Sequence, residues 1–220
     1  MNKLIQELEN TLPEGMYIPE AIKTLYNWIE DNNLYAERGG LRIGSLYPEE
    51  KLKASWTDDE REGGTDIEFS ASGNDSLKYW FGKDSDEIKA RLCVFAKSGA
   101  EGSQCALWKD DSGDVKVVHL GSGSGSTLCC VLADSAVDFL RLLAIGYDEI
   151  CWDECFPYPP NKGEDVELYV KPNIEFQDWV KTTFNVTIPN NALEIVKYPA
   201  SMDDDESEDA FFNWCKKILD

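Results

Sequence analysis

Apolar runs alternate with turn residues in the middle of the chain, between residues 93 and 133. The runs are rich in Val, Leu, Cys and aromatic residues, and clusters of Gly, Ser and Asp separate them. This pattern is typical of antiparallel strands joined by short turns. It predicts a meander with these strands: 90–97, 104–109, 115–120 and 127–133.

An apolar helix is expected directly after the meander, over residues 134–145. Its apolar positions recur at helical spacing: Ala136, Phe139, Leu140 and Leu143. Asp134 is placed to cap the first turn, and Gly146 stands where a left-handed residue often ends a helix. The sheet and this helix should form one core.

The helical spacing of apolar residues and the alternation of apolar runs with turns also predict the remaining elements. Helices are expected at 3–11, from Pro19 onward, at 174–184 and at 210–219. Strands are expected at 41–46, 67–71 and 77–81, a charged helix and loop at 48–64, and a loop at 151–163. The predicted fold is α+β, with a mainly antiparallel central sheet and helices packed on it, in a single domain over residues 1–220.

Residues 85–220 resemble the SUKH superfamily of Smi/Knr type. The resemblance lies in FAKSGAEGSQCALW (95–108), the helical phrase DFLRLLA, FQDWVKTTFNVTIPNNALEIV (176–196) and the closing DAFFNWCKKIL. The usual Gly-Asp-Gly turn of the family is Gly99-Ala100-Glu101-Gly102 here. The superfamily includes many bacterial toxin-immunity proteins and a fungal regulator of cell-wall synthesis. The resemblance therefore implies a noncatalytic protein that binds another protein.

The sequence gives no sign of export or membrane insertion. The N-terminal residues lack an uninterrupted apolar segment, and no run of 18 apolar residues occurs, so a cytoplasmic protein is expected. Seven cysteines are an odd number, and five of them fall in apolar patterns: Cys93, Cys105, Cys129, Cys130 and Cys215. Reduced, buried thiols explain this usage better than a disulfide framework.

Negative charge is concentrated in three segments of a chain whose formal net charge is -21. Residues 49–66 carry seven acidic and three basic side chains, residues 148–178 nine and two, and residues 203–209 six and none, which together give -17. Such a surface repels nucleic acids and anionic membranes and attracts basic proteins. Toxins that cut nucleic acids are commonly basic, so a toxin domain is the expected partner.

Motifs for catalysis or cofactor binding are weak, and no cofactor is expected. Residues 121–126, GSGSGS, lack the Lys and the following helix of a phosphate-binding loop and predict a hairpin loop instead. His119 is the only histidine, and nothing places a nucleophile beside it, so a structural or surface role is expected. Residues 203–209 lack the pattern of a calcium loop and should instead favour the N-terminus of the last helix.

Loop 151–163 can be interpreted in two ways. Cys151, Asp153, Glu154 and Cys155 could contribute to a metal site, but no second pair of ligands at zinc-site spacing is present. Aromatic residues inside an acidic rim instead suit the centre of a protein interface. The predicted partner-binding residues are Asp58, Asp59, Glu60, Glu62, Asp148, Glu149, Trp152, Asp153, Glu154 and Phe156.

The favoured interpretation is an immunity protein that neutralises a bacterial toxin, such as a nuclease, by direct binding. Two alternatives stay open at this point. One is a regulatory scaffold like the fungal relative. The other is a hydrolase whose acidic cleft holds a metal or cleaves a glycosidic bond with a carboxylate pair drawn from Glu149, Asp153 and Glu154.

Overall fold

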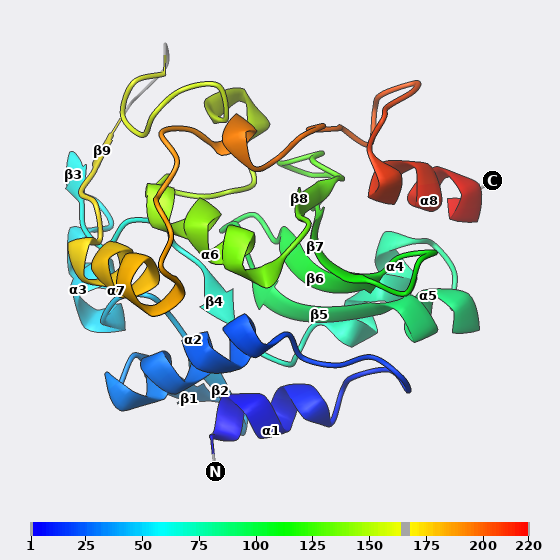
Figure 1. Ribbon diagram of the computed structural model, residues 1–220, viewed down its shortest axis with the longest axis horizontal. Helices are drawn as coiled ribbons and strands as arrows, with labels where there is room; N and C mark the ends of the chain where they lie inside the picture. Colours follow the sequence, from blue (N-terminus) through cyan, green and yellow to red (C-terminus); the bar gives the residue numbers. More distant parts are fainter. Residues whose placement is uncertain (1, 164–167, 220) are drawn as a thin grey trace.

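The computed structural model describes residues 2–163 and 168–219, and its centre is a seven-stranded sheet (Figure 1). The strands lie in the order β1-β2-β4-β5-β6-β7-β8, and all neighbours are antiparallel. They are β1 Tyr35–Arg38, β2 Leu41–Gly44, β4 Glu68–Phe69, β5 Leu92–Lys97, β6 Gln104–Lys109, β7 Val115–Leu120 and β8 Val131–Ala133. The α+β fold predicted from the sequence is confirmed.

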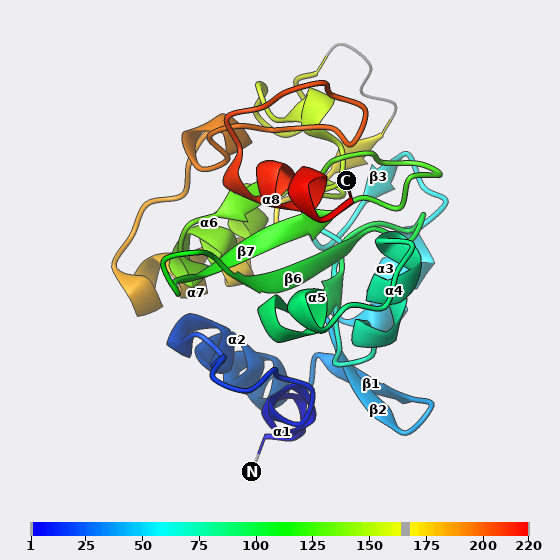
Figure 2. The ribbon, with the colours of Figure 1, turned by 90° about the vertical axis from the view of Figure 1, so that its right-hand side faces the viewer.

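Helices cover both faces of the sheet (Figures 1 and 2). One layer contains α1 Lys3–Glu9, α2 Glu20–Asp31, α6 Ala136–Ile145 and α7 Ile174–Phe184. The opposite layer contains α4 Leu77–Trp80, α5 Asp86–Arg91 and α8 Ala210–Leu219. Strands between two such layers are buried on both sides, which explains why β5, β6 and β7 read as nearly continuous apolar runs.

Alternate residues of the central strands point to the two layers. Phe95 and Leu107 contribute to the core under α2 and α6, and Phe95 packs edge-on against Phe139 with ring centroids 5.7 Å apart. Val94 and Trp108 contribute to the core under α8, where Trp108 meets Phe211 at 5.3 Å. The five cysteines expected in the core are all buried, and the thiols of all seven cysteines are free.

A small parallel sheet lies beside the main one and contains part of the first acidic segment. It pairs β3 Glu60–Arg61 with β9 Tyr169–Val170. The remaining elements are α3 Glu49–Ser55 and three short 3-10 helices: η1 Asn74–Ser76, η2 Asp153–Cys155 and η3 Ala192–Glu194. No helix in the described part of the chain combines the length and the apolar character needed to cross a bilayer.

Three local predictions were wrong, and one strand was missed. Residues 77–81 are not a strand, because Leu77–Trp80 forms helix α4. The first meander strand begins at Leu92, since α5 runs to Arg91, and strand β1 was not predicted. Predicted strand 127–133 shrinks to β8, because Cys129 N–H donates to Ala200 O at 2.7 Å instead of to a neighbouring strand.

The cap of α6 is Ser135 and not Asp134. The Ser135 hydroxyl accepts from the Asp138 N–H at 3.1 Å. Asp134 pairs instead with Lys116 at 2.8 Å and with Lys197. Gly146 ends the helix with φ +95°, as the sequence predicts.

Candidate functional site

Residues 148–163 and 203–209 lie towards the end of the molecule drawn at the top of Figures 1 and 2, and the first acidic segment, with α3 and β3, lies along the adjoining side; together we call them the acidic end. Arg61 of β3 donates from Nη1 to both carboxylate oxygens of Asp148 at 2.6 Å, which joins the first segment to the second. Burial raises the pKa of Asp153, and the carboxylates of Glu154 and Asp204 add to the shift. The third segment therefore lies close enough to the second to affect its charge.

A cavity of about 660 Å³ opens between loop 146–163 and β9, and we call it the acidic cavity. Its acidic and aromatic lining residues are Asp148, Glu149, Glu154, Tyr147, Trp152 and Tyr158. No Lys or Arg occurs among the described residues that line it. Four predicted partner-binding residues therefore line one cavity: Asp148, Glu149, Trp152 and Glu154.

Asp148 and Glu149 also hold the loop in place. Asp148 is bound by Arg61, and its backbone oxygen accepts from the Asp66 N–H at 2.8 Å. The Glu149 carboxylate accepts from the backbone N–H of Ala100 and from Trp152 Nε1 at 2.8 Å. Glu149 thus fixes the orientation of the Trp152 indole at the cavity wall.

Phe156 is not an interface residue, contrary to the sequence prediction. Its side chain is fully buried and packs against Tyr147, with ring centroids 6.2 Å apart. Its backbone oxygen accepts from Ala192 N–H at 3.1 Å. The exposed aromatic residue of this loop is Tyr158, which lines the acidic cavity. The alternation of aromatic residues and prolines in this loop did not indicate which ring turns inward.

The first acidic segment lies outside the lining of the acidic cavity. Asp58, Asp59 and Glu60 are exposed. Lys171 of the neighbouring chain segment pairs with Glu60 at 3.0 Å and with Glu62 at 3.8 Å. Glu62 also accepts from the Tyr47 hydroxyl at 2.7 Å.

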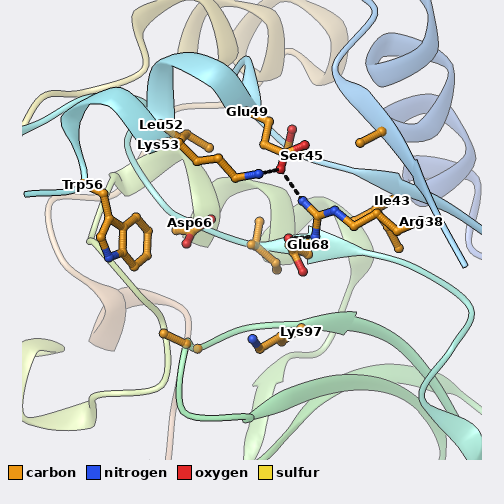
Figure 3. Close-up of a pocket in the computed structure, with 14 residues that line it drawn as sticks. Arg38, Ile43, Ser45, Glu49, Leu52, Lys53, Trp56, Asp66, Glu68 and Lys97 are labelled. Atoms are coloured by element: carbon orange, nitrogen blue, oxygen red, sulfur yellow. Dashed lines mark hydrogen bonds and ion pairs between the residues drawn. The ribbon is translucent and has the colours of Figure 1, made fainter.

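A second cavity of about 400 Å³ lies beneath α3, and we call it the Trp56 cavity (Figure 3). Part of its rim is held by a network of ion pairs. Arg38 contacts Glu68 at 2.6 Å and Glu49 at 2.5 Å, and Lys53 also pairs with Glu49. Trp56 is 40% exposed, and the Arg61 guanidinium lies 4.3 Å from the centre of its ring.

Asp66 lines the Trp56 cavity outside that network (Figure 3). Burial raises its pKa to about 6, and the carboxylates of Asp148, Glu149 and Glu68 add to the rise, whereas Arg61 opposes it. The negative charge of Asp66 is therefore unfavourable in the folded protein near neutral pH.

Replacing Asp66 by Asn is expected to stabilise the protein at neutral pH. Because the folded pKa exceeds the ordinary value of 3.8, the folded state binds the proton more tightly, and stability falls as the pH rises from about 4 to about 6. At pH 7.5 the substitution should raise the free energy of unfolding by about 1–3 kcal/mol, and at pH 4 by much less. Urea unfolding at both pH values measures this.

Asp58→Asn is the control for that experiment. Asp58 is exposed, so its loss should change the free energy of unfolding by less than about 0.5 kcal/mol at either pH. If Asp66→Asn lowered stability at pH 7.5, the electrostatic account of Asp66 would be wrong.

His119 lies in the core and has a serine partner that the sequence did not indicate. Its Nε2 and the Ser98 hydroxyl are 2.9 Å apart, and its Nδ1 lies 2.9 Å from Leu128 O. Burial lowers its pKa to about 4. Both side chains are fully buried, so the pair links β7 to the start of the β5–β6 turn and is closed to solvent.

The other motifs have structural roles. The glycine-rich run forms a hairpin loop, as predicted, with Gly121 N–H donating to Leu128 O and Gly123 N–H to Ser126 O, both at 2.9 Å. Asp209, the last acid of the third segment, caps α8 by accepting from Phe212 N–H at 2.8 Å. Across residues 2–163 and 168–219, no three His, Cys, Asp or Glu side chains are grouped as metal ligands would be.

Comparison with known proteins leaves the family open. No family model matches this chain, and neither a curated protein nor a solved structure shows significant similarity to it.

Proposed function

We propose that this protein is a noncatalytic binding protein that captures a basic protein partner with the acidic end of the molecule. The observation that carries the proposal is the acidic cavity, where carboxylates and aromatic rings meet without a basic side chain among the described lining residues. Protein interfaces use large aromatic residues as anchors, and a field of one sign accelerates the capture of a partner of opposite sign.

The partner that fits best is a toxin domain that binds nucleic acid. Such a domain carries clustered Lys and Arg for its substrate, and an acidic surface competes for those side chains. The resemblance of residues 85–220 to the SUKH superfamily also supports an immunity role, because that superfamily includes many toxin-immunity proteins. In this role the protein blocks access of the substrate and needs no chemistry of its own.

Coexpression tests the proposal. The candidate partner is a basic C-terminal domain encoded by a gene adjacent to the gene for this chain, produced in a bacterial host from an inducible promoter. Growth should stop when the domain is produced alone and should continue when this chain is produced with it, and the two purified chains should form a stable complex. Arrest of growth in both cultures, with no complex between soluble proteins, would contradict the proposal.

A further inference from the structure

Some of the charged side chains that line the Trp56 cavity form ion pairs with one another, and others do not. Arg38, Lys53, Glu49 and Glu68 neutralise one another in the network described above. The Asp66 carboxylate accepts no hydrogen bond and forms no ion pair with any described residue, and Figure 3 shows it outside the chain of dashed contacts. Asp66 is therefore available to a group from outside the chain.

The surroundings of Asp66 favour a positive charge. Three carboxylates from two parts of the chain act on it, namely Glu68 of β4 and the pair Asp148 and Glu149 after α6. Arg61 is the cation that acts on it, but both oxygens of Asp148 already accept from its Nη1, and its guanidinium lies over Trp56. A partly buried carboxylate with carboxylate neighbours destabilises the free protein, and an incoming cation would relieve this.

The walls of the cavity suit the rest of a long basic side chain. Trp56, Leu52 and Ile67 supply an apolar surface beside Asp66, against which methylene groups can pack. A guanidinium is planar, weakly hydrated and able to stack on an indole while it donates two hydrogen bonds to one carboxylate. Trp56 is 40% exposed, so part of its ring surface is accessible.

We propose that the Trp56 cavity receives an arginine side chain of the basic partner, with its guanidinium bound to Asp66 and its methylene groups against Trp56 and Leu52. This proposal rests on the proposed function for the identity of the partner. It assigns a specific contact to a residue that lies outside the acidic cavity. It also explains why the chain keeps a carboxylate that destabilises its own fold, since binding sites commonly retain such residues.

Lys97 provides a second test of the proposal. It lies in the lining of the same cavity and pairs with no carboxylate among the described residues. Its positive charge opposes the entry of a guanidinium, so Lys97→Gln should bind arginine at least as tightly as the unchanged protein, whereas Asp66→Asn should bind it more weakly. Weaker binding in Asp66→Asn without any loss in Lys97→Gln is not expected from a general disturbance of the cavity.

The test uses small probes and needs no protein partner. N-acetylarginine amide carries the guanidinium without charged ends, and N-acetylcitrulline amide is its neutral counterpart. Each is titrated into 15N-labelled protein at pH 7.5, and 1H–15N correlation spectra are recorded, with the Trp56 indole signal assigned from a Trp56→Phe sample. The arginine probe should shift the signals of Trp56 and Asp66 in a saturable way, with a dissociation constant on the order of 1–10 mM. The citrulline probe should not.

Three variants complete the test. Asp66→Asn should weaken binding of the arginine probe about tenfold or more, while its thermal unfolding shows that the protein is folded. Lys97→Gln should bind at least as tightly as the unchanged protein. Asp31→Asn removes an equal charge from the exposed end of α2 and should leave the dissociation constant within about twofold. Equal binding by Asp66→Asn, a tenfold loss in Lys97→Gln, or shifts confined to the acidic cavity would overturn the proposal.

Failure of this inference differs from failure of the proposed function. If a toxin domain binds tightly but the arginine probe does not reach Asp66, the proposed function stands and the inference is wrong. If the probe binds at Asp66 but this chain does not protect growth against the toxin domain, the site stands as a guanidinium site and the immunity role fails.

Discussion

Neutralising four exposed carboxylates is expected to slow association with the basic partner by about tenfold or more at low salt. The variant replaces Asp58, Asp59 and Asp203 by Asn and Glu154 by Gln. All four are exposed, so the free energy of unfolding should change little. The difference in association rate should shrink as salt rises, because the screening length falls from about 10 Å at 0.1 M to about 3 Å at 1 M. Stopped-flow mixing over a salt series measures both effects.

Asp148 and Glu149 are left out of this variant. Their replacement should lower stability, since they bind Arg61, Ala100 and Trp152. Removing one partner of a partly buried ion pair leaves the other charge uncompensated. A change in binding by such a variant would therefore mix an interface effect with a folding effect.

A matched variant separates position from net charge. It replaces four exposed carboxylates elsewhere: Glu14, Asp31, Asp75 and Glu87. Both variants lose four negative charges, but only the first loses them from the acidic end. Equal slowing by the two variants would mean that net charge alone attracts the partner, and unchanged rates in the first would remove the acidic end from the interface.

Strong local periodicity made several elements predictable to the residue. Strands β6 and β7 and helices α7 and α8 begin and end where the sequence pattern places them. In each case the apolar repeat is long for its element and is bounded by turn or capping residues, such as Asn173, which accepts from the Phe176 N–H at the start of α7. The local conformational preference of these segments agrees with their tertiary packing, and this agreement makes a prediction from sequence reliable.

Helix α4 shows how β-forming residue types mislead. Tyr79, Trp80 and Phe81 favour a strand by composition, yet Leu77 and Phe81 lie one helical turn apart and are both buried under α8. The spacing was the better signal, because burial of an amphipathic face outweighs the small differences in intrinsic propensity.

Long-range pairing accounts for the error in β8, and an edge position accounts for the error in β1. The backbone around Cys129 bonds to Ala200, about seventy positions later, which no local pattern encodes. Strand β1 lies at the edge of the sheet and has charged residues at its end, so it lacks the apolar alternation of a central strand.

The candidate site could be predicted in position but not in the role of each residue. Composition located the acidic segments, but whether a carboxylate is free depends on residues far along the chain, as with Asp148 and Arg61 or Glu149 and Ala100. The Trp56 cavity was missed altogether. One feature of the sequence could have indicated this cavity, namely a tryptophan inside a charged segment. Such a ring is either a core residue or part of a binding surface.

Replacing Phe156 by Ala is expected to lower the free energy of unfolding by about 3–5 kcal/mol, because a fully buried aromatic ring is lost and a cavity remains. The ring packs against Tyr147, whose hydroxyl donates to Tyr158 O at 2.7 Å and accepts from Ala192 N–H at 2.9 Å. Loss of the Phe156 ring should therefore loosen the whole wall of the acidic cavity. Urea unfolding measures the effect.

Tyr158→Ala is the matched change on the other side of the same loop. Tyr158 is 37% exposed and lines the acidic cavity, and the backbone oxygen that holds Tyr147 stays in place after the substitution. Stability should fall by no more than about 1 kcal/mol, while binding of the partner should weaken about tenfold or more if the ring is an anchor. Calorimetric titration of the toxin domain with both variants separates the two roles: full affinity of Tyr158→Ala would place the interface outside this cavity, and undiminished stability of Phe156→Ala would show that Phe156 is not part of the core.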